Sequence, residues 1–170
     1  SFHHRKESAL SMTGAMLAWA DAGAGSSRGG EVLDALSQLA GRLHPLTVHF
    51  PVGLLLVAAL AEVWGAFRKR PAASPLARGC LWFGALTACA AAGMGWLNAA
   101  HEFAGDTTLT LAVHRWMGVG IAVTAMFAAF MSLAAGNANM PRAVGAYRAG
   151  LLLSALLVAV GGHFGGVLTH

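Results

Sequence analysis

The segment GRLHPLTVHFPVGLLLVAALAEVW, residues Gly41 to Trp64, decides the fold of this chain. It leads into an apolar run, from Leu46 to Phe67, that has about the 20 residues needed to cross the hydrocarbon core of a bilayer. Two histidines, His44 and His49, stand at its start. An imidazole in such a place costs free energy unless it has a partner. The segment therefore predicts a membrane helix whose first turns contain histidines that need a bound or hydrogen-bonded partner.

The composition agrees with a membrane protein. Of the 170 residues, 56% are apolar and only 11% are charged, and the mean hydropathy is +0.61, which is too apolar for a soluble domain of this length. The few basic residues lie beside apolar runs and form no patch with aromatic residues, so we expect no nucleic-acid partner. The two cysteines, Cys80 and Cys89, form no CxxCH motif, which excludes covalent haem attachment to this chain.

Four apolar runs are long enough to span a bilayer, at about 46–67, 76–100, 113–135 and 146–170. We predict an all-α, integral membrane four-helix bundle over residues 44–170. Residues 1–43 form a separate N-terminal segment, with a short amphipathic interfacial helix from Glu31 to Leu43. Two overlapping GxxxG pairs near the C-terminus favour close helix packing and offer a surface for oligomerisation.

The basic residues predict the orientation of the bundle, because Lys and Arg collect in cytoplasmic connections. The first connection carries Arg68, Lys69 and Arg70, and the third carries Arg142. The connection between them has no Lys or Arg. We therefore expect both termini on the extracytoplasmic side.

On this topology, all the histidines in and beside the bundle fall at the extracytoplasmic face. They are His44, His49, His101, His114, His163 and His170. A single histidine at a membrane interface is usually a hydrogen-bonded structural residue. Several that converge on one layer favour a cofactor or metal role.

Haem b is the leading cofactor, because two histidines from different helices and a flat apolar slot suffice to hold it. We expect His49 and His163 to be the axial ligands, with His114 as the substitute. His44 and His170 then lie beside these ligands or at a second cofactor. Glycines around His163 and after His114 leave room for a porphyrin face.

Two arginines on the same side, Arg115 and Arg42, suit the haem propionates. The same residues serve equally well as anchors for lipid headgroups. Copper or zinc is the alternative cofactor, and it would need a tight cluster of three or four histidines, drawn from His49, His163 and His114 with a neighbour. No catalytic carboxylate pair, Ser/His/Asp set or phosphate loop is recognisable, so we expect an electron-transfer or accessory subunit and no stand-alone enzyme.

Three motifs at helix ends carry a resemblance: HPLTVHFPVGLLL, VHRWMG and GGHFGGVLTH. Residues 43 to 170 are similar to an uncharacterised bacterial family of four-helix membrane domains that open with HP-x3-HFP. In some bacteria, notably planctomycetes, the domain is fused ahead of a cytochrome c-type domain. The resemblance implies a membrane module that works beside extracytoplasmic haem proteins. It carries over His44, His49, His114 and His163, with His170 at its end, and members usually continue past that last position.

The leading hypothesis is a multi-pass electron-transfer module of the bacterial inner membrane, with its histidines facing the periplasm. Its partners would be the lipid bilayer, a c-type cytochrome, other membrane redox subunits or quinol. The alternative is a non-catalytic structural or assembly subunit of a larger membrane complex. Ion transport is disfavoured, because the cytoplasmic halves of the last two helices offer few polar residues, namely Thr124, Ser132 and Ser154.

Overall fold

The computed structural model describes residues 29–102, 104–105, 108–136 and 139–169. The chain divides into two compact units, Ser1–Leu39 and Ala40–His170. In the first unit, residues 29–39 are helical, and this helix continues to residue 42. It begins slightly earlier than the helix predicted from Glu31. His170, one of the predicted site residues, lies outside the described residues.

The second unit consists of helices, and no strand occurs in the described part of the chain. The helices are α2 (His44–Thr47), α3 (His49–Phe67), α4 (Pro75–Glu102), α5 (Leu109–Ala135) and α6 (Pro141–Thr169). Among the described residues, four stretches are long and apolar enough to cross a membrane: α2 with α3, then α4, α5 and α6. The predicted all-α four-helix membrane fold is therefore confirmed.

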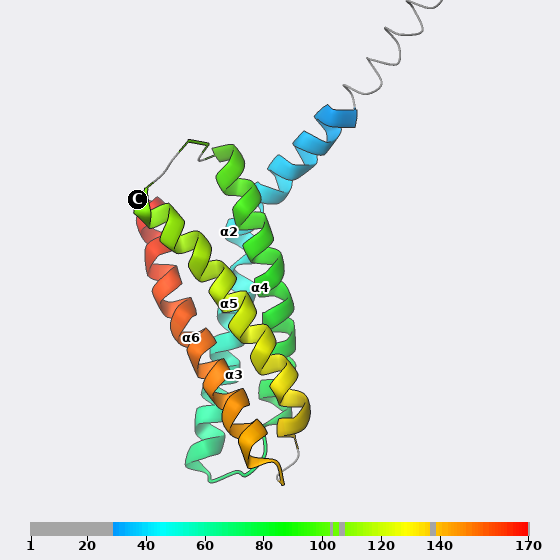
Figure 1. The fold of residues 1–170 in the computed structure, drawn as a ribbon, viewed down its shortest axis with the longest axis vertical. Helices are drawn as coiled ribbons and strands as arrows, with labels where there is room; N and C mark the ends of the chain where they lie inside the picture. Colours follow the sequence, from blue (N-terminus) through cyan, green and yellow to red (C-terminus); the bar gives the residue numbers. More distant parts are fainter. Residues whose placement is uncertain (1–28, 103, 106–107, 137–138, 170) are drawn as a thin grey trace, which may run out of the picture. The chain divides into compact units, whose positions relative to one another are not determined.

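Successive long helices run in opposite directions, as Figure 1 shows. In the order of the chain, α3 packs against α4, α4 against α5 and α5 against α6, and α3 also touches α6. We call α2, α3 and α4 the first hairpin, and α5 and α6 the second hairpin.

The break between α2 and α3 follows from a proline. Val48 stands between the two helices with right-handed helical angles, φ −63° and ψ −23°. The amide of Val48 donates to the carbonyl of His44 at 3.0 Å, and the amide of Val52 donates to that of Val48 at 3.2 Å. Pro51 has no amide hydrogen to give to the carbonyl of Thr47. The chain therefore continues in one direction through an irregular turn, as the prolines predict.

Three helices begin earlier than the hydropathy of the chain predicts. Pro75 and Pro141 are the first residues of α4 and α6, a position at which the missing amide hydrogen and the fixed φ of proline suit a helix. α5 begins at Leu109, because the preceding Thr108 is extended and its hydroxyl accepts a hydrogen bond from the amide of Leu111. The apolar span therefore underestimates the length of each of these helices at its N-terminal end.

The core of the bundle occupies one half of its length. Its largest fully buried side chains are Tyr147, Leu55, Leu81 and Leu151, and most of the remainder is alanine. Most of these residues lie in the half nearer the connections that follow Phe67 and Ala135. Small residues let helices approach closely in a membrane, where dispersion contacts drive association. The other half is packed differently and contains the candidate site.

The two hairpins bury equivalent positions, related by the offset that separates His44 from His114. In α3 the buried residues include Leu55, Ala58, Ala59, Glu62 and Gly65. In α5 the residues at the same offset are also buried: Ala125, Ala128, Ala129, Ser132 and Ala135. The same holds for Ala77, Leu81, Gly84, Ala88 and Ala91 of α4 and for Tyr147, Leu151, Ser154, Val158 and Gly161 of α6. The bundle is thus a structural repeat of two helical hairpins.

Candidate functional site

A cavity of about 520 Å³ opens at one end of the bundle. We call this the histidine end; here α4 finishes, α5 begins, and His44, His114 and His163 lie. Residues of α2 to α6 line the cavity, and its walls are mostly apolar. The polar or aromatic residues in the lining are His44, His49, Trp96, Asn98, His114 and Arg115. Its volume falls within the range of about 300–1,000 Å³ that is usual for small-molecule and cofactor sites.

Two histidine rings that line this cavity lie close to each other in an edge arrangement. The ring centroids of His44 and His114 are 6.3 Å apart, and the ring planes make an angle of 80°. Both side chains are half-buried. His44 belongs to the first hairpin and His114 occupies the equivalent position of the second. The repeat therefore brings one imidazole from each hairpin to a shared place.

Both rings are held in the same manner by the other helix of their own hairpin. Nδ1 of His44 lies 2.9 Å from the carbonyl oxygen of Ala91 in α4, and Nδ1 of His114 lies 3.2 Å from that of Gly161 in α6. A carbonyl oxygen only accepts, so each Nδ1 must carry the hydrogen that it donates. In the neutral imidazole this leaves Nε2 without a hydrogen, in the form that accepts a hydrogen bond or binds a metal.

The two histidines predicted as axial ligands are not brought together. His163 is exposed, does not line the cavity and lies beside the ring of Phe164. His49 is exposed at the rim of the cavity, and its Nδ1 lies 2.7 Å from the carbonyl oxygen of Pro45. The pairing of His49 with His163 stays a prediction, and the geometry favours His44 with His114.

Helix periodicity explains this difference. Gly161 and Gly165 of α6 line the cavity, and His163, between them, is rotated by about 200° from either one. His49 has the same relation to the buried Pro51 of α3. His44 lies two turns before Pro51, on the inner face. The positions of the buried residues relative to His44 and His114 were a signal that sequence reasoning missed.

The two predicted arginines differ in their surroundings. Arg115 lines the cavity, and its guanidinium carbon lies 3.7 Å from the ring centroid of Trp96. Its Nε is buried and has no hydrogen-bond partner among the described residues. Arg42 instead pairs with Glu102, Nε to Oε1 at 3.2 Å, with both side chains exposed. Arg115 is thus the arginine with an unused donor at the cavity.

The described residues contain no group of three or more His, Cys, Asp or Glu side chains placed to hold a metal ion. His49, His163 and His114 do not form the predicted cluster; His49 and His163 are exposed, and His163 does not line the cavity. What the structure assembles is a pair of imidazoles. A pair suits a cofactor that brings most of its own ligands.

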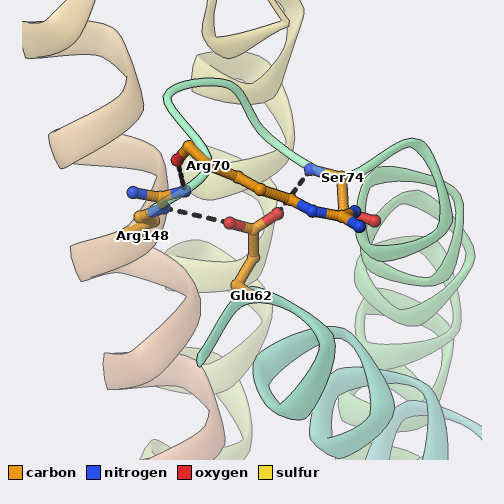
Figure 2. A network of polar contacts seen from close by, with 4 residues as sticks. All are labelled: Glu62, Arg70, Ser74 and Arg148. Atoms are coloured by element: carbon orange, nitrogen blue, oxygen red, sulfur yellow. Dashed lines mark hydrogen bonds and ion pairs between the residues drawn. The ribbon is translucent and has the colours of Figure 1, made fainter. Parts of the chain in front are cut away.

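The opposite end of the bundle, the arginine end, contains a polar network around Glu62 (Figure 2). The side chain of Glu62 is buried, and its Oε2 accepts from Nε of Arg148 at 3.0 Å. Its Oε1 accepts from the amide of Ser74 at 2.6 Å. A second nitrogen of Arg148, Nη2, donates to the carbonyl of Arg70 at 3.0 Å. These bonds tie α3, α6 and the connection between α3 and α4 together.

The fold and the paired histidines define a helical membrane protein that holds two imidazoles above an apolar cavity. The chain belongs to the family described as predicted membrane protein (DUF2231), whose model matches residues 41–170. No curated protein and no solved structure matched the chain. The family match begins just before His44 and covers both hairpins.

Proposed function

We propose that this protein binds haem b between His44 and His114 and serves as an electron-transfer module of the membrane. The pair replaces His49 and His163 in this proposal, because His44 and His114 both line the cavity and their ring centroids lie 6.3 Å apart. The proposal keeps the cofactor expected from the sequence and changes the residues that hold it.

The observation that carries the proposal is the separation of the two rings. A histidine nitrogen binds a metal ion at about 2.0 Å, so two imidazoles on opposite sides of one ion have centroids about 6 Å apart. The observed separation is 6.3 Å. The angle of 80° between the rings is compatible, because each ring can rotate about its own bond to the metal. The hydrogen bonds at Nδ1 leave Nε2 of each ring as the ligand atom.

The cavity wall supports a flat apolar cofactor. Five of its lining residues are glycines of α5 and α6: Gly118, Gly161, Gly162, Gly165 and Gly166. Glycine leaves the helix backbone bare and allows another group to approach closely. The unused Nε of Arg115 lies at the same cavity and suits a propionate. When bound, the haem would supply an iron that accepts and releases one electron.

The distribution of basic residues supports the expected orientation. The arginine end carries Arg68, Lys69, Arg70, Arg78, Arg142 and Arg148. By the positive-inside rule this end faces the cytoplasm, so we place the histidine end at the periplasmic face of a bacterial inner membrane. A haem there would exchange electrons with a periplasmic c-type cytochrome, another membrane redox subunit or quinol.

An absorption spectrum of the purified full chain tests the proposal. After expression with added haem precursor, we expect a Soret band in both the oxidised and the reduced protein. A pyridine haemochrome assay should identify haem b at about one per chain, the number that one pair of axial ligands can hold. Protein that contains no haem under either condition would overturn the proposal.

A second candidate is a structural or assembly subunit of a larger membrane complex. One observation favours it: both rings already donate to a helix carbonyl, and that alone would stabilise the two hairpins. In that case His44→Gln and His114→Gln would lower assembly and leave the spectrum of the complex unchanged. Copper or zinc is weaker as a third candidate, because two histidines supply only half of a tetrahedral ligand set. Metal analysis of the same preparation tests it directly.

A further inference from the structure

In each hairpin, a glycine of the second helix lies against the histidine ring of the first helix. A Cβ atom added at Gly95 would lie 2.9 Å from Cε1 and 3.2 Å from Nδ1 of His44. One added at Gly165 would lie 3.0 Å from Cε1 and 3.4 Å from Nδ1 of His114. Real Cβ atoms essentially never approach another heavy atom to less than 3.0 Å. At Gly95 the ring of His44 therefore occupies space that a Cβ atom would need, and at Gly165 the ring of His114 would have to move by a few tenths of an ångström.

The glycines and the carbonyl acceptors form one unit in each hairpin. Gly95 follows Ala91 by one helical turn, so both lie on the same face of α4. Gly165 follows Gly161 in the same way on α6. In both hairpins the histidine and its carbonyl acceptor are separated by 47 residues. The same arrangement thus occurs twice, at equivalent positions of the structural repeat.

We infer that Gly95 and Gly165 are positioning residues, which hold the rings of His44 and His114 against the helix backbone and so direct both Nε2 atoms to the ligand. This inference deepens the proposed function and rests on it for the identity of the ligand. The carbonyl fixes which nitrogen carries the hydrogen, and the glycine lets the ring lie close enough to reach that carbonyl.

A methyl group at either glycine would act on the ring directly. The ring is rigid and its Nδ1 is already within hydrogen-bonding distance of a carbonyl, so it cannot move aside without lengthening that bond. We expect the ring to tilt away from α4 or α6 and its Nε2 to turn away from the proposed ligand. Loss of a group that orients a metal-binding histidine typically lowers metal affinity by about 10–100-fold.

The experiment compares glycine-to-alanine variants of the full chain. Gly95→Ala and Gly165→Ala are the test variants. Gly93→Ala in α4 and Gly145→Ala in α6 are the controls, because an added Cβ meets nothing within 4 Å at either position and neither residue lines the cavity. Haem affinity and the spectrum of the bound haem are measured for all four. We expect a loss of about 10–100-fold for each test variant and an unchanged affinity for each control.

A second measurement needs no haem. Nitrogen NMR of the imidazole rings in haem-free protein reports whether Nδ1 carries the hydrogen and donates it. We expect this signature for His44 in the wild type and in Gly93→Ala, and its loss in Gly95→Ala; His114 should respond in the same way to Gly165→Ala. If the wild type bound no haem, the proposed function would fail while this measurement still tested the glycines.

Removing the ring separates positioning from general packing. In a His44→Ala background the added methyl of Gly95→Ala has no ring to meet, so we expect that it no longer lowers the thermal unfolding midpoint. In the wild-type background it should do so. The inference is overturned if Gly95→Ala and Gly93→Ala behave alike in affinity and in NMR, or if the effect of Gly95→Ala persists without His44.

Discussion

The two ends of the bundle bury polar groups in different ways. At the arginine end, Glu62 is 2% exposed, and both of its carboxylate oxygens receive hydrogen bonds from within the chain. At the histidine end, His44 and His114 each use Nδ1 and present a second nitrogen at a cavity. Hydrogen bonds to both oxygens of a buried carboxylate stabilise the fold without a ligand. Unused ring nitrogens beside an apolar cavity are what a bound cofactor would require.

We therefore propose that one end serves the stability of the fold and the other end serves ligand binding. The packed core lies toward the arginine end and the cavity toward the histidine end. Binding sites are commonly less tightly packed than the scaffold that supports them. Substitutions at the arginine end should therefore leave ligand binding largely unchanged, and substitutions at the histidine end should leave the stability of the fold largely unchanged.

The largest effect should come from removing one ring of the pair. His44→Ala or His114→Ala takes away a proposed haem ligand, and we expect a loss of bound haem greater than the about 10–100-fold effect of an outer hydrogen-bond partner. Spectra of purified variants measure it. His163→Ala is the matched control, because that side chain is exposed and does not line the cavity. Retention of haem by both ring variants with loss in His163→Ala would reverse the assignment of the ligands.

A smaller effect, on stability, should follow at the arginine end. Glu62→Ala leaves Arg148 without its carboxylate; breaking a buried ion pair in this way costs about 3–5 kcal/mol, and the partial exposure of Arg148 favours the lower value. Denaturation in mild detergent measures it, with the haem content per folded chain expected to stay at the wild-type level.

Glu102→Ala provides the comparison for that prediction. It breaks the exposed pair with Arg42, for which we expect at most about 1 kcal/mol. If Glu62→Ala and Glu102→Ala lowered the free energy of unfolding equally, the burial of Glu62 would add nothing to the strength of its ion pair. Loss of haem from folded Glu62→Ala protein would contradict the separation of the two ends.

The smallest effect should come from the arginine beside the cavity. Arg115→Gln keeps a polar side chain but removes the positive charge, and a lost charged hydrogen bond in this half-buried place should weaken haem binding by about tenfold. Haem titration measures it. Arg42→Gln is the control, because Arg42 already pairs with Glu102 and does not line the cavity. An unchanged affinity in Arg115→Gln would remove this residue from the site.

Much of this architecture could be predicted from hydropathy. The four spans, their antiparallel order and the convergence of His44, His49, His114 and His163 on one end follow from local composition and from the alternation of direction. Helix starts were less well predicted, because Pro75, Pro141 and the cap at Thr108 extend helices beyond their apolar residues. Hydropathy identifies the residues that fit the hydrocarbon core of a bilayer. The first turn of a helix lies partly outside that core, so hydropathy does not locate it.

The partner of each histidine could not be predicted in the same way. The sequence neighbours of His49 and His163 are as apolar as those of His44 and His114. Only the rotation of each helix about its axis decides which of these side chains lie toward the interior. Once the buried residues are known, the repeat gives that rotation, since His44 and His114 recur at the offset that also relates the buried residues. The close approach of Gly95 and Gly165 to the rings has no counterpart in local sequence.

The sequence by itself determined that this protein is a bundle of membrane-spanning helices with histidines at one end and basic residues at the other. Hydropathy and charge act through the surrounding bilayer, so each segment responds to them independently. The tertiary structure alone decided that His44 meets His114 while His49 and His163 stay exposed. That outcome depends on how two hairpins pack and rotate against each other, a property of pairs of helices and not of any single segment.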